Sequence, residues 1–216
     1  SGGRVHQDIV DGLDHLAARG IGDPENTAIV GHSYGGFAAL VGAIEHPGRY
    51  RAAVATAPPI DLVRAFRDLA PEHETPSGLS LAVWMREVFV DLDDQEAVAE
   101  ERRRSPEMRL GATGVPLLLM AGGLDEKVSV VDVRYFAGEL AALDHDVSLL
   151  VDDEAGHSFD TPHMPKARAV LTERFLGRWL GGDVVPVEDP ELDAYLASRM
   201  VLTGPSLAAE PKSTSD

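Results

Sequence analysis

Short apolar runs alternate with longer amphipathic stretches along most of this chain. The apolar runs are four to six residues long, rich in Val, Ile, Leu and Ala, and predict buried strands at Thr27–Val30, Ala52–Ala57, Pro116–Ala121 and Val147–Val151. The longer stretches carry apolar residues at helical spacing and predict helices at Arg4–Arg19, Tyr34–Glu45, Val130–Leu143 and Pro165–Leu180. Because parallel neighbours need long crossovers, this alternation predicts an α/β fold, with a parallel sheet joined by helices.

One internal region interrupts the alternation. Between Leu62 and Arg104 we expect several short helical segments, among them Leu81–Val90 and Gln95–Arg104, separated by prolines and acidic residues. We expect this region to pack over a site and to shape a pocket. Its candidate wall residues are aromatic, although core packing explains each at least as well: Phe66, Trp84 and Phe89.

The composition changes again from Gly181 onward, toward Pro, Glu, Asp and Ser. We expect one short helix there, at Glu191–Met200, followed by a mobile tail in the last dozen residues. The chain opens at Ser1 without methionine or a signal-peptide pattern and already reads as a helix at Arg4, so we expect a further segment upstream. The expected location is the cytoplasm, and export stays open because the natural start is not in view.

Charge and composition exclude several classes of partner. The 216 residues hold 44% hydrophobic and 25% charged side chains, as in ordinary globular domains. A formal net charge of −17 repels phosphate backbones and anionic headgroups, so neither nucleic acid nor a membrane surface is an expected partner. The chain has no cysteine, which rules out disulfides and thiolate metal sites.

The stretch Gly31-His32-Ser33-Tyr34-Gly35 fits the pattern G-x-S-x-G. Its three fixed positions would arise by chance in roughly 7 of 100 chains of this length. The context is more specific, because the pattern follows a predicted strand and opens a predicted helix, as a nucleophile elbow requires. We expect side chains at Gly31 and Gly35 to collide with the neighbouring turn and strand. The amide of Tyr34 is the natural first oxyanion donor; the alternative is that Ser33 only caps the helix.

A serine nucleophile needs a histidine base and an acid that orients it. Asp125 follows the predicted strand Pro116–Ala121, and His157 follows Val147–Val151. Both therefore lie in loops at the carboxyl ends of strands, where open α/β sheets form their sites, and the order Ser, Asp, His is that of α/β-hydrolases. Asp61 is the competing acid, while Asp152, Asp153 and Glu154 lie too near His157 in sequence to be favoured.

The alternatives without a catalytic role are that Asp125 only stabilises a turn and that His157 is a solvated loop histidine. We expect the remaining histidines to be solvent-exposed on helix faces or loops: His6, His15, His46, His73, His145 and His163. No H-E-x-x-H or comparable ligand spacing occurs, so no metal is predicted, and the triad chemistry needs no cofactor.

Three segments resemble the catalytic domain of the prolyl oligopeptidase family of serine peptidases: "QDIVDGLDHLAARGIGDPENTAIVGHSYGGFAAL", "SPEMRLGATGVPLLLMAGGLDEKVSV" and "DDEAGHSFDTP". The likeness covers about Gln7 to Gly181 and includes the forms G-x-S-Y-G-G, D-x-x-V and G-H-x-F. It implies an α/β-hydrolase fold, with the C-terminal part of the catalytic domain in residues 1–182. The composition beyond that point predicts an acidic, Pro-containing, partly mobile extension in 183–216. It implies these roles: nucleophile Ser33, acid Asp125, base His157, oxyanion amide Tyr34, elbow glycines Gly31, Gly35 and Gly36, and specificity-pocket wall Val128.

The resemblance also implies parts that this sequence lacks. In the family about four strands precede the elbow strand, a second oxyanion donor is commonly a tyrosine hydroxyl in that part, and a β-propeller restricts access to small peptides. Without an upstream neighbour the strand Thr27–Val30 would be a bare edge. We therefore expect an upstream segment or a companion chain to complete the sheet.

Three functions are consistent with these residues. The first is a serine peptidase that cleaves short peptides, since the family cleaves peptide bonds, often after proline or near the N-terminus. The second is a serine hydrolase of the same fold acting on esters, thioesters, lactones or acylated small molecules, because fold and triad do not fix the acyl group. The third is a non-catalytic hydrolase-fold binding module, against which the intact Ser33, Asp125 and His157 argue.

Overall fold

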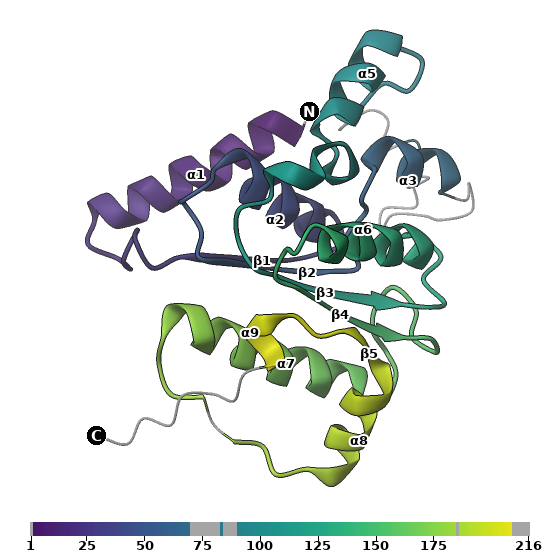
Figure 1. The fold of residues 1–216 in the computed structure, drawn as a ribbon. Coiled ribbons are helices and arrows are strands. Elements are labelled where there is room, and N and C mark those ends of the chain that lie inside the picture. The colour runs from purple at the N-terminus through teal and green to yellow at the C-terminus, as the bar shows by residue number, and fades with distance from the viewer. Residues whose placement is uncertain (1, 70–82, 84–89, 185, 209–216) are drawn as a thin grey trace.

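A five-stranded sheet forms the centre of the molecule (Figure 1), in the order β1-β2-β3-β4-β5. The computed structural model describes residues 2–69, 83, 90–184 and 186–208. The strands are Ala28–His32, Ala52–Thr56, Leu117–Gly122, Val147–Asp152 and Met200–Leu202. The first four are mutually parallel, and β5 is antiparallel to β4. The α/β fold is therefore confirmed, and the four predicted strands lie within two residues of their expected bounds.

Helices cover both faces of the sheet (Figure 1). On one side lie α1, α2 and α6, spanning Gly2–Ala18, Tyr34–Glu45 and Val130–Ala142. On the other side lie α7, α8 and α9, spanning Met164–Leu180, Pro190–Arg199 and Pro205–Ala208. The shorter elements α3, α5 and the 3-10 helix η1 span Leu62–Asp68, Gln95–Arg104 and Pro106–Ala112.

Alternating side chains of the strands feed two separate cores. In β3, Leu117 and Leu119 point into the core under α2 and α6, whereas Leu118 and Met120 point into the core over α7. Every residue of β2, β3 and β4 is thus buried by helices on its own side, which is why these strands read as continuous apolar runs and not as polar alternation. These helices do not cover the edge formed by the carboxyl ends of the parallel strands, where the connecting loops begin.

The irregular region is described only in part. The predicted helix Leu81–Val90, with Trp84 and Phe89, lies outside the described residues except for Val83 and Val90, as do His73 and the tail from residue 209. Phe66 of α3 is buried in a third apolar cluster with Phe37, Val41 and Leu62. The core-packing interpretation therefore holds for Phe66.

Beyond residue 182 the chain continues the sheet and the lower helix layer. The helix expected at Glu191–Met200 is present as α8, and its Leu192 and Leu196 are buried against the sheet. Strand β5 was not predicted, because three residues give no period to read. Ser206 of α9 donates a hydrogen bond to Asp146 and accepts one from the indole of Trp179 at 2.9 Å. This segment is thereby tied to the residue that precedes β4 and to α7.

The expectation that His6 is solvent-exposed is wrong. His6 is only 1% exposed, and its ring packs against that of His46 with centroids 4.8 Å apart. The cause is Gly42 of α2: a Cβ there would lie 2.4 Å from the His6 ring, so a glycine is what lets the ring fit between α1 and α2. Burial, and then the neighbouring His46, lower the pKa of His6, which favours the neutral ring.

Three of the other histidines are also not fully exposed. His46, His145 and His163 are half-buried, and a ring nitrogen of His145 lies 2.9 Å from the carbonyl of Val115. Only His15 is exposed among those the structure describes and that were expected to be so. A neutral imidazole offers both a donor and an acceptor, so it can be placed at a half-buried position at low cost.

Candidate active site

Ser33 occupies a sharp turn between β1 and α2. Its backbone has φ 57° and ψ −123°, a combination that non-glycine residues rarely adopt. Such a conformation costs about 1–3 kcal/mol and persists only where the surroundings impose it. Here the Ser33 amide donates to the carbonyl of Thr56 at 2.8 Å, and the Ser33 carbonyl accepts from Phe37 at 3.0 Å. The side chain makes no cap hydrogen bond to α2, so Ser33 is not an ordinary helix cap.

The glycines around Ser33 have different roles. A Cβ at Gly31 would lie 2.0 Å from the carbonyl oxygen of Gly35, so only glycine fits there. A Cβ at Gly36 would lie 3.0 Å from the carbonyl oxygen of Thr56, a tight contact but a less severe one than at Gly31. The expected collision at Gly35 is wrong, because a Cβ there would meet no atom within 4 Å. The turn brings the Cα of Gly31 against the backbone of Gly35. A side chain is therefore excluded at position 31 but not at position 35.

The three residues predicted to form a triad are in contact. The Nε2 atom of His157 lies 2.9 Å from Ser33 Oγ, and its Nδ1 lies 2.8 Å and 3.0 Å from the two carboxylate oxygens of Asp125. A carboxylate can only accept, so Nδ1 carries the proton and Nε2 presents its lone pair to the serine hydroxyl. The side chain of Asp125 is 2% exposed and that of His157 is 15% exposed, so water competes little for either bond.

Asp125 is held by its own loop, which in turn packs against the loop that carries His157. Its Oδ1 accepts the backbone amides of Lys127 at 2.8 Å and Val128 at 2.9 Å. The loop after β3 also lies directly on the loop after β4, because a Cβ at Gly122 would be 2.4 Å from the carbonyl of Ala155. The amide of Leu124 donates to that same carbonyl at 2.9 Å. The two loops that carry Asp125 and His157 are therefore fixed relative to each other.

The competing acid has another function. Asp61 is buried, caps α3 by accepting the amide of Arg64 at 3.0 Å, and lies 3.3 Å from Nε of Arg102. Its carboxylate is thus engaged by arginines, and the bonds to His157 come from Asp125. Asp61 stabilises α3 and α5.

His32 is a member of the site that the sequence reasoning did not single out. Its ring centroid lies 5.1 Å from that of His157 and 5.5 Å from that of Phe159, and its Nδ1 is 3.0 Å from Thr56 Oγ1. Burial, then the proximity of His157 and Arg168, lower its pKa. A neutral His32 puts no positive charge beside the imidazole that must accept a proton. The available signal was its position, immediately before the serine of the motif.

Tyr34 follows Ser33 as the first residue of α2. Its amide lies at the positive end of the helix dipole, next to the position where an oxyanion would form on attack by Ser33. The phenol ring packs beside Phe37, with centroids 5.9 Å apart. Burial, and then Glu101, raise the pKa of the Tyr34 hydroxyl to about 12, so the phenol remains neutral at physiological pH.

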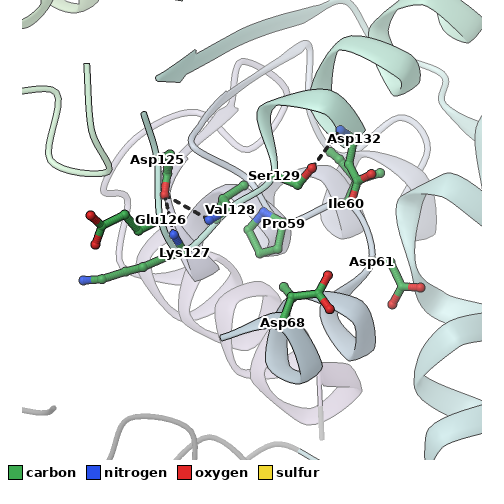
Figure 2. Close-up of a pocket in the computed structure, with 11 residues that line it drawn as sticks. Pro59, Ile60, Asp61, Asp68, Asp125, Glu126, Lys127, Val128, Ser129 and Asp132 are labelled. Carbon is green, nitrogen blue, oxygen red and sulfur yellow. Dashed lines mark hydrogen bonds between the residues drawn. The ribbon is translucent and has the colours of Figure 1, made fainter. Parts of the chain in front are cut away.

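A cavity of about 150 Å³ opens on the Asp125 side of the triad (Figure 2). Pro59, Ile60 and Val128 contribute apolar surface, and Figure 2 shows Val128 donating its amide to Asp125. Ser33 and His157 are not among the lining residues, so a contact of Val128 with substrate stays a prediction. The lining also includes five carboxylates: Asp61, Asp68, Asp125, Glu126 and Asp132.

Neither a metal centre nor a membrane span is found in the part of the chain that the structure describes. No three His, Asp or Glu side chains there gather closely enough to hold a metal ion. No helix in those same ranges combines the length and apolar character needed to cross a bilayer.

A strained serine on a strand-to-helix turn, with its base and acid on the next two carboxyl-end loops of a parallel sheet, defines the class of α/β-hydrolase-fold proteins with a serine triad. The comparison with known families agrees. The model of the prolyl oligopeptidase family matches residues 1–183, and this chain belongs to that family.

Curated relatives are longer than this chain. It is 26% identical to dipeptidyl aminopeptidase BIII of Pseudoxanthomonas mexicana over 188 residues, which cover 86% of this chain and 26% of that protein. It is 24% identical to acylamino-acid-releasing enzyme 1 of Oryza sativa subsp. japonica over 160 residues, 72% of this chain and 20% of that protein. The chain thus spans about a quarter of the first relative and a fifth of the second.

Solved structures share the fold. A puromycin-hydrolyzing peptidase of Mycobacterium tuberculosis superposes with a TM-score of 0.70 at 23% identity, over 85% of this chain and 26% of that one. The acylaminoacyl peptidase of Pyrococcus horikoshii gives a TM-score of 0.65 at 19% identity, over 88% of this chain and 29% of that one. At these identities the likeness establishes the α/β-hydrolase fold.

Proposed function

We propose that the protein is a serine-type peptidase that hydrolyses peptide bonds of short peptides through an acyl-enzyme. The observation that carries the proposal is the continuous chain of contacts from Asp125 through His157 to Ser33, at 2.8 Å and 2.9 Å. Family membership supports it, as do relatives named as a dipeptidyl aminopeptidase and an acylamino-acid-releasing enzyme.

The first half of the reaction acylates the serine. Nε2 of His157 removes the proton of Ser33 as the Oγ atom attacks the carbonyl carbon of the substrate. The negative charge that develops on the carbonyl oxygen faces the amide of Tyr34, while Asp125 stabilises the imidazolium. His157 then gives its proton to the leaving amine, the carbon–nitrogen bond breaks, and the acyl group remains on Ser33.

The second half repeats the same steps with water as the nucleophile. His157 takes a proton from the water, whose oxygen attacks the acyl carbon, and then returns the proton to Ser33 Oγ as the ester bond breaks. The acid product leaves and the triad is restored. Every proton that His157 accepts is returned within the cycle, so no cofactor is required.

A serine-directed fluorophosphonate probe tests this proposal. The wild-type protein is expected to be labelled on Ser33, and Ser33→Ala is expected to lose labelling, because Ser33 Oγ supplies the only bond that the probe forms with the triad. Mass spectrometry of the labelled peptide locates the adduct. Labelling that persists in Ser33→Ala would refute the assignment, and a wild type that is never labelled would support a non-catalytic binding module.

The substrate class is tested by comparing amide with ester turnover. The triad fixes acyl transfer but not the acyl group, so a matched peptide p-nitroanilide and p-nitrophenyl ester separate the two hydrolase hypotheses. A peptidase is expected to turn over the anilide at a measurable kcat/KM. Turnover confined to the ester would contradict peptidase activity while leaving the triad assignment intact.

The exposed edge of the sheet supports a further polypeptide segment as partner. Among the described strands β1 pairs only with β2, and the apolar Val30 at its centre is 53% exposed. An apolar edge strand of this kind tends to acquire a neighbour. We propose that an additional segment, covalent or on a companion chain, completes the sheet at β1. Native mass spectrometry of the protein from its source should show mass beyond the 23.1 kDa of this chain; an active species of that mass alone would contradict the proposal.

A further inference from the structure

Asp152, the last residue of β4, closes the base of the loop that carries His157. Its residue is 1% exposed, and its Oδ2 accepts hydrogen bonds from Thr161 Oγ1 at 2.5 Å and from the Tyr195 hydroxyl at 2.8 Å. Its Oδ1 accepts the amide of Glu154 at 3.1 Å. Asp152 precedes His157 by five residues and Thr161 follows it by four, so one carboxylate joins the two ends of the histidine loop.

The Tyr195 hydroxyl comes from α8, beyond the residues that the family model matches. Its ring also packs against that of His163, at the far end of the same loop, with centroids 5.3 Å apart. The hydroxyl has one proton, and the buried carboxylate at 2.8 Å is a stronger acceptor than the sulfur of Met164 at 3.4 Å. Tyr195 therefore contacts both ends of the loop, through its oxygen at one and its ring at the other.

Arg199, one turn further along α8, reinforces this attachment. Its guanidinium nitrogens lie 3.6 Å from Asp152, 3.8 Å from Asp153 and 3.5 Å from Glu154. Burial acts to raise the pKa of Asp152, but the hydrogen bonds from Thr161 and Tyr195 outweigh it, and the pKa lies below its usual range. The carboxylate is accordingly ionised, and α8 supplies both a donor and a positive charge to it.

We propose that Tyr195 is a positioning residue for His157, because its hydroxyl secures the Asp152–Thr161 contact that fixes both ends of the histidine loop. The inference rests on the proposed function, in which His157 is the base. The segment after residue 183 lies outside the part of the chain that the family model matches, and the inference gives this segment a role in positioning the site.

The expected effect follows from the geometry. Hydrogen bonds to a charged group are stronger than those between neutral groups, so without the Tyr195 donor the carboxylate of Asp152 is held less firmly. His157 must keep Nε2 within hydrogen-bond reach of Ser33, and a displacement of 1 Å at such a point costs as much as about 10²-fold in rate. Loss of one of two side-chain donors should give a smaller loss, about tenfold.

The test compares two variants that each loosen the C-terminal segment at a different place. Tyr195→Phe removes the hydroxyl at the histidine loop and keeps the ring on His163. Ser206→Ala is the matched control. It removes the hydrogen bonds with Asp146 and Trp179, which lie near the start of β4, at the end of that strand opposite to Asp152. The measurements are the fluorophosphonate labelling rate of Ser33, kcat and KM on a peptide p-nitroanilide, the melting temperature, and hydrogen exchange of residues 153–163.

Tyr195→Phe is expected to lower the labelling rate and kcat about tenfold, to leave KM within about twofold, and to speed exchange in 153–163. Ser206→Ala should lower the melting temperature while keeping the labelling rate within about twofold. The double variant Thr161→Val/Tyr195→Phe should lower the labelling rate by less than the product of the two single-variant factors, because both hydroxyls donate to the same oxygen of Asp152.

The inference is overturned if Tyr195→Phe labels within about twofold of wild type, or if Ser206→Ala loses as much reactivity at an equal loss of melting temperature. Failure of the proposed function gives a different result, namely a wild type that is not labelled at Ser33. Hydrogen exchange decides the positioning role even then, since unchanged exchange in 153–163 would overturn it.

Discussion

Asp125→Asn is expected to lower kcat by about 10⁴-fold with little loss of folded protein. Oδ1 of Asp125 accepts two backbone amides, from Lys127 and Val128, and the asparagine carbonyl can keep both bonds. Its amino group then faces Nδ1 of His157 and donates to it. The imidazole is driven to the tautomer with the proton on Nε2, which cannot accept the proton of Ser33. Steady-state kinetics and a melting curve of the same preparation measure the two effects.

Asp61→Asn is the matched comparison, because Asp61 is also a buried carboxylate in a loop that follows a strand. Its ion pairs are with Arg64 and Arg102, so the variant should lose stability. Its kcat is expected to fall by less than about tenfold, since Asp61 makes no bond to the triad histidine. If Asp61→Asn had the larger effect on kcat, the assignment of Asp125 as the orienting acid would be wrong.

Gly31→Ala is expected to destabilise the protein by at least about 3 kcal/mol, which corresponds to a melting temperature lower by about 10 °C. The new Cβ would lie 2.0 Å from the carbonyl oxygen of Gly35, and the clash is with backbone, not with the movable end of a side chain. Relief requires the turn to open, which also displaces Ser33 from His157. Differential scanning calorimetry and probe labelling measure the two consequences.

Gly35→Ala separates steric from general effects of adding a methyl group at this turn. A Cβ at Gly35 meets nothing within 4 Å, and the residue is not among those with positive φ. Its melting temperature should therefore stay within a few degrees of wild type, because alanine is favoured over glycine in a helix by about 0.5–1 kcal/mol. Equal destabilisation of the two variants would contradict the account of why Gly31 is a glycine.

The fold and the candidate triad were largely accessible from local patterns. Parallel strands buried on both faces appear as short apolar runs, and each predicted triad residue lies within five residues after the end of a strand. The carboxyl ends of parallel strands meet at one edge of the sheet, so sequence positions separated by 92 and 32 residues could be placed together without knowing the detailed packing.

The errors and omissions have a common origin. His6 was expected in solvent, but a glycine on another helix gives its ring a buried site. Strand β5 has three residues and exists only because β4 offers an edge. Gly35 belongs to the motif yet has open space around it. Each depends on what lies opposite in space, and nothing in the neighbouring sequence records it.

The sequence by itself determined the α/β alternation, the strained serine turn and the three residues that could form a triad, because periodicity and turn chemistry act between near neighbours in the chain. The tertiary structure decided which aspartate meets His157, how His32 lies beside it, and that Tyr195 reaches Asp152 across 43 residues of chain. Those contacts depend on loop closure and on packing between layers. Their energies arise from distances that no local pattern specifies.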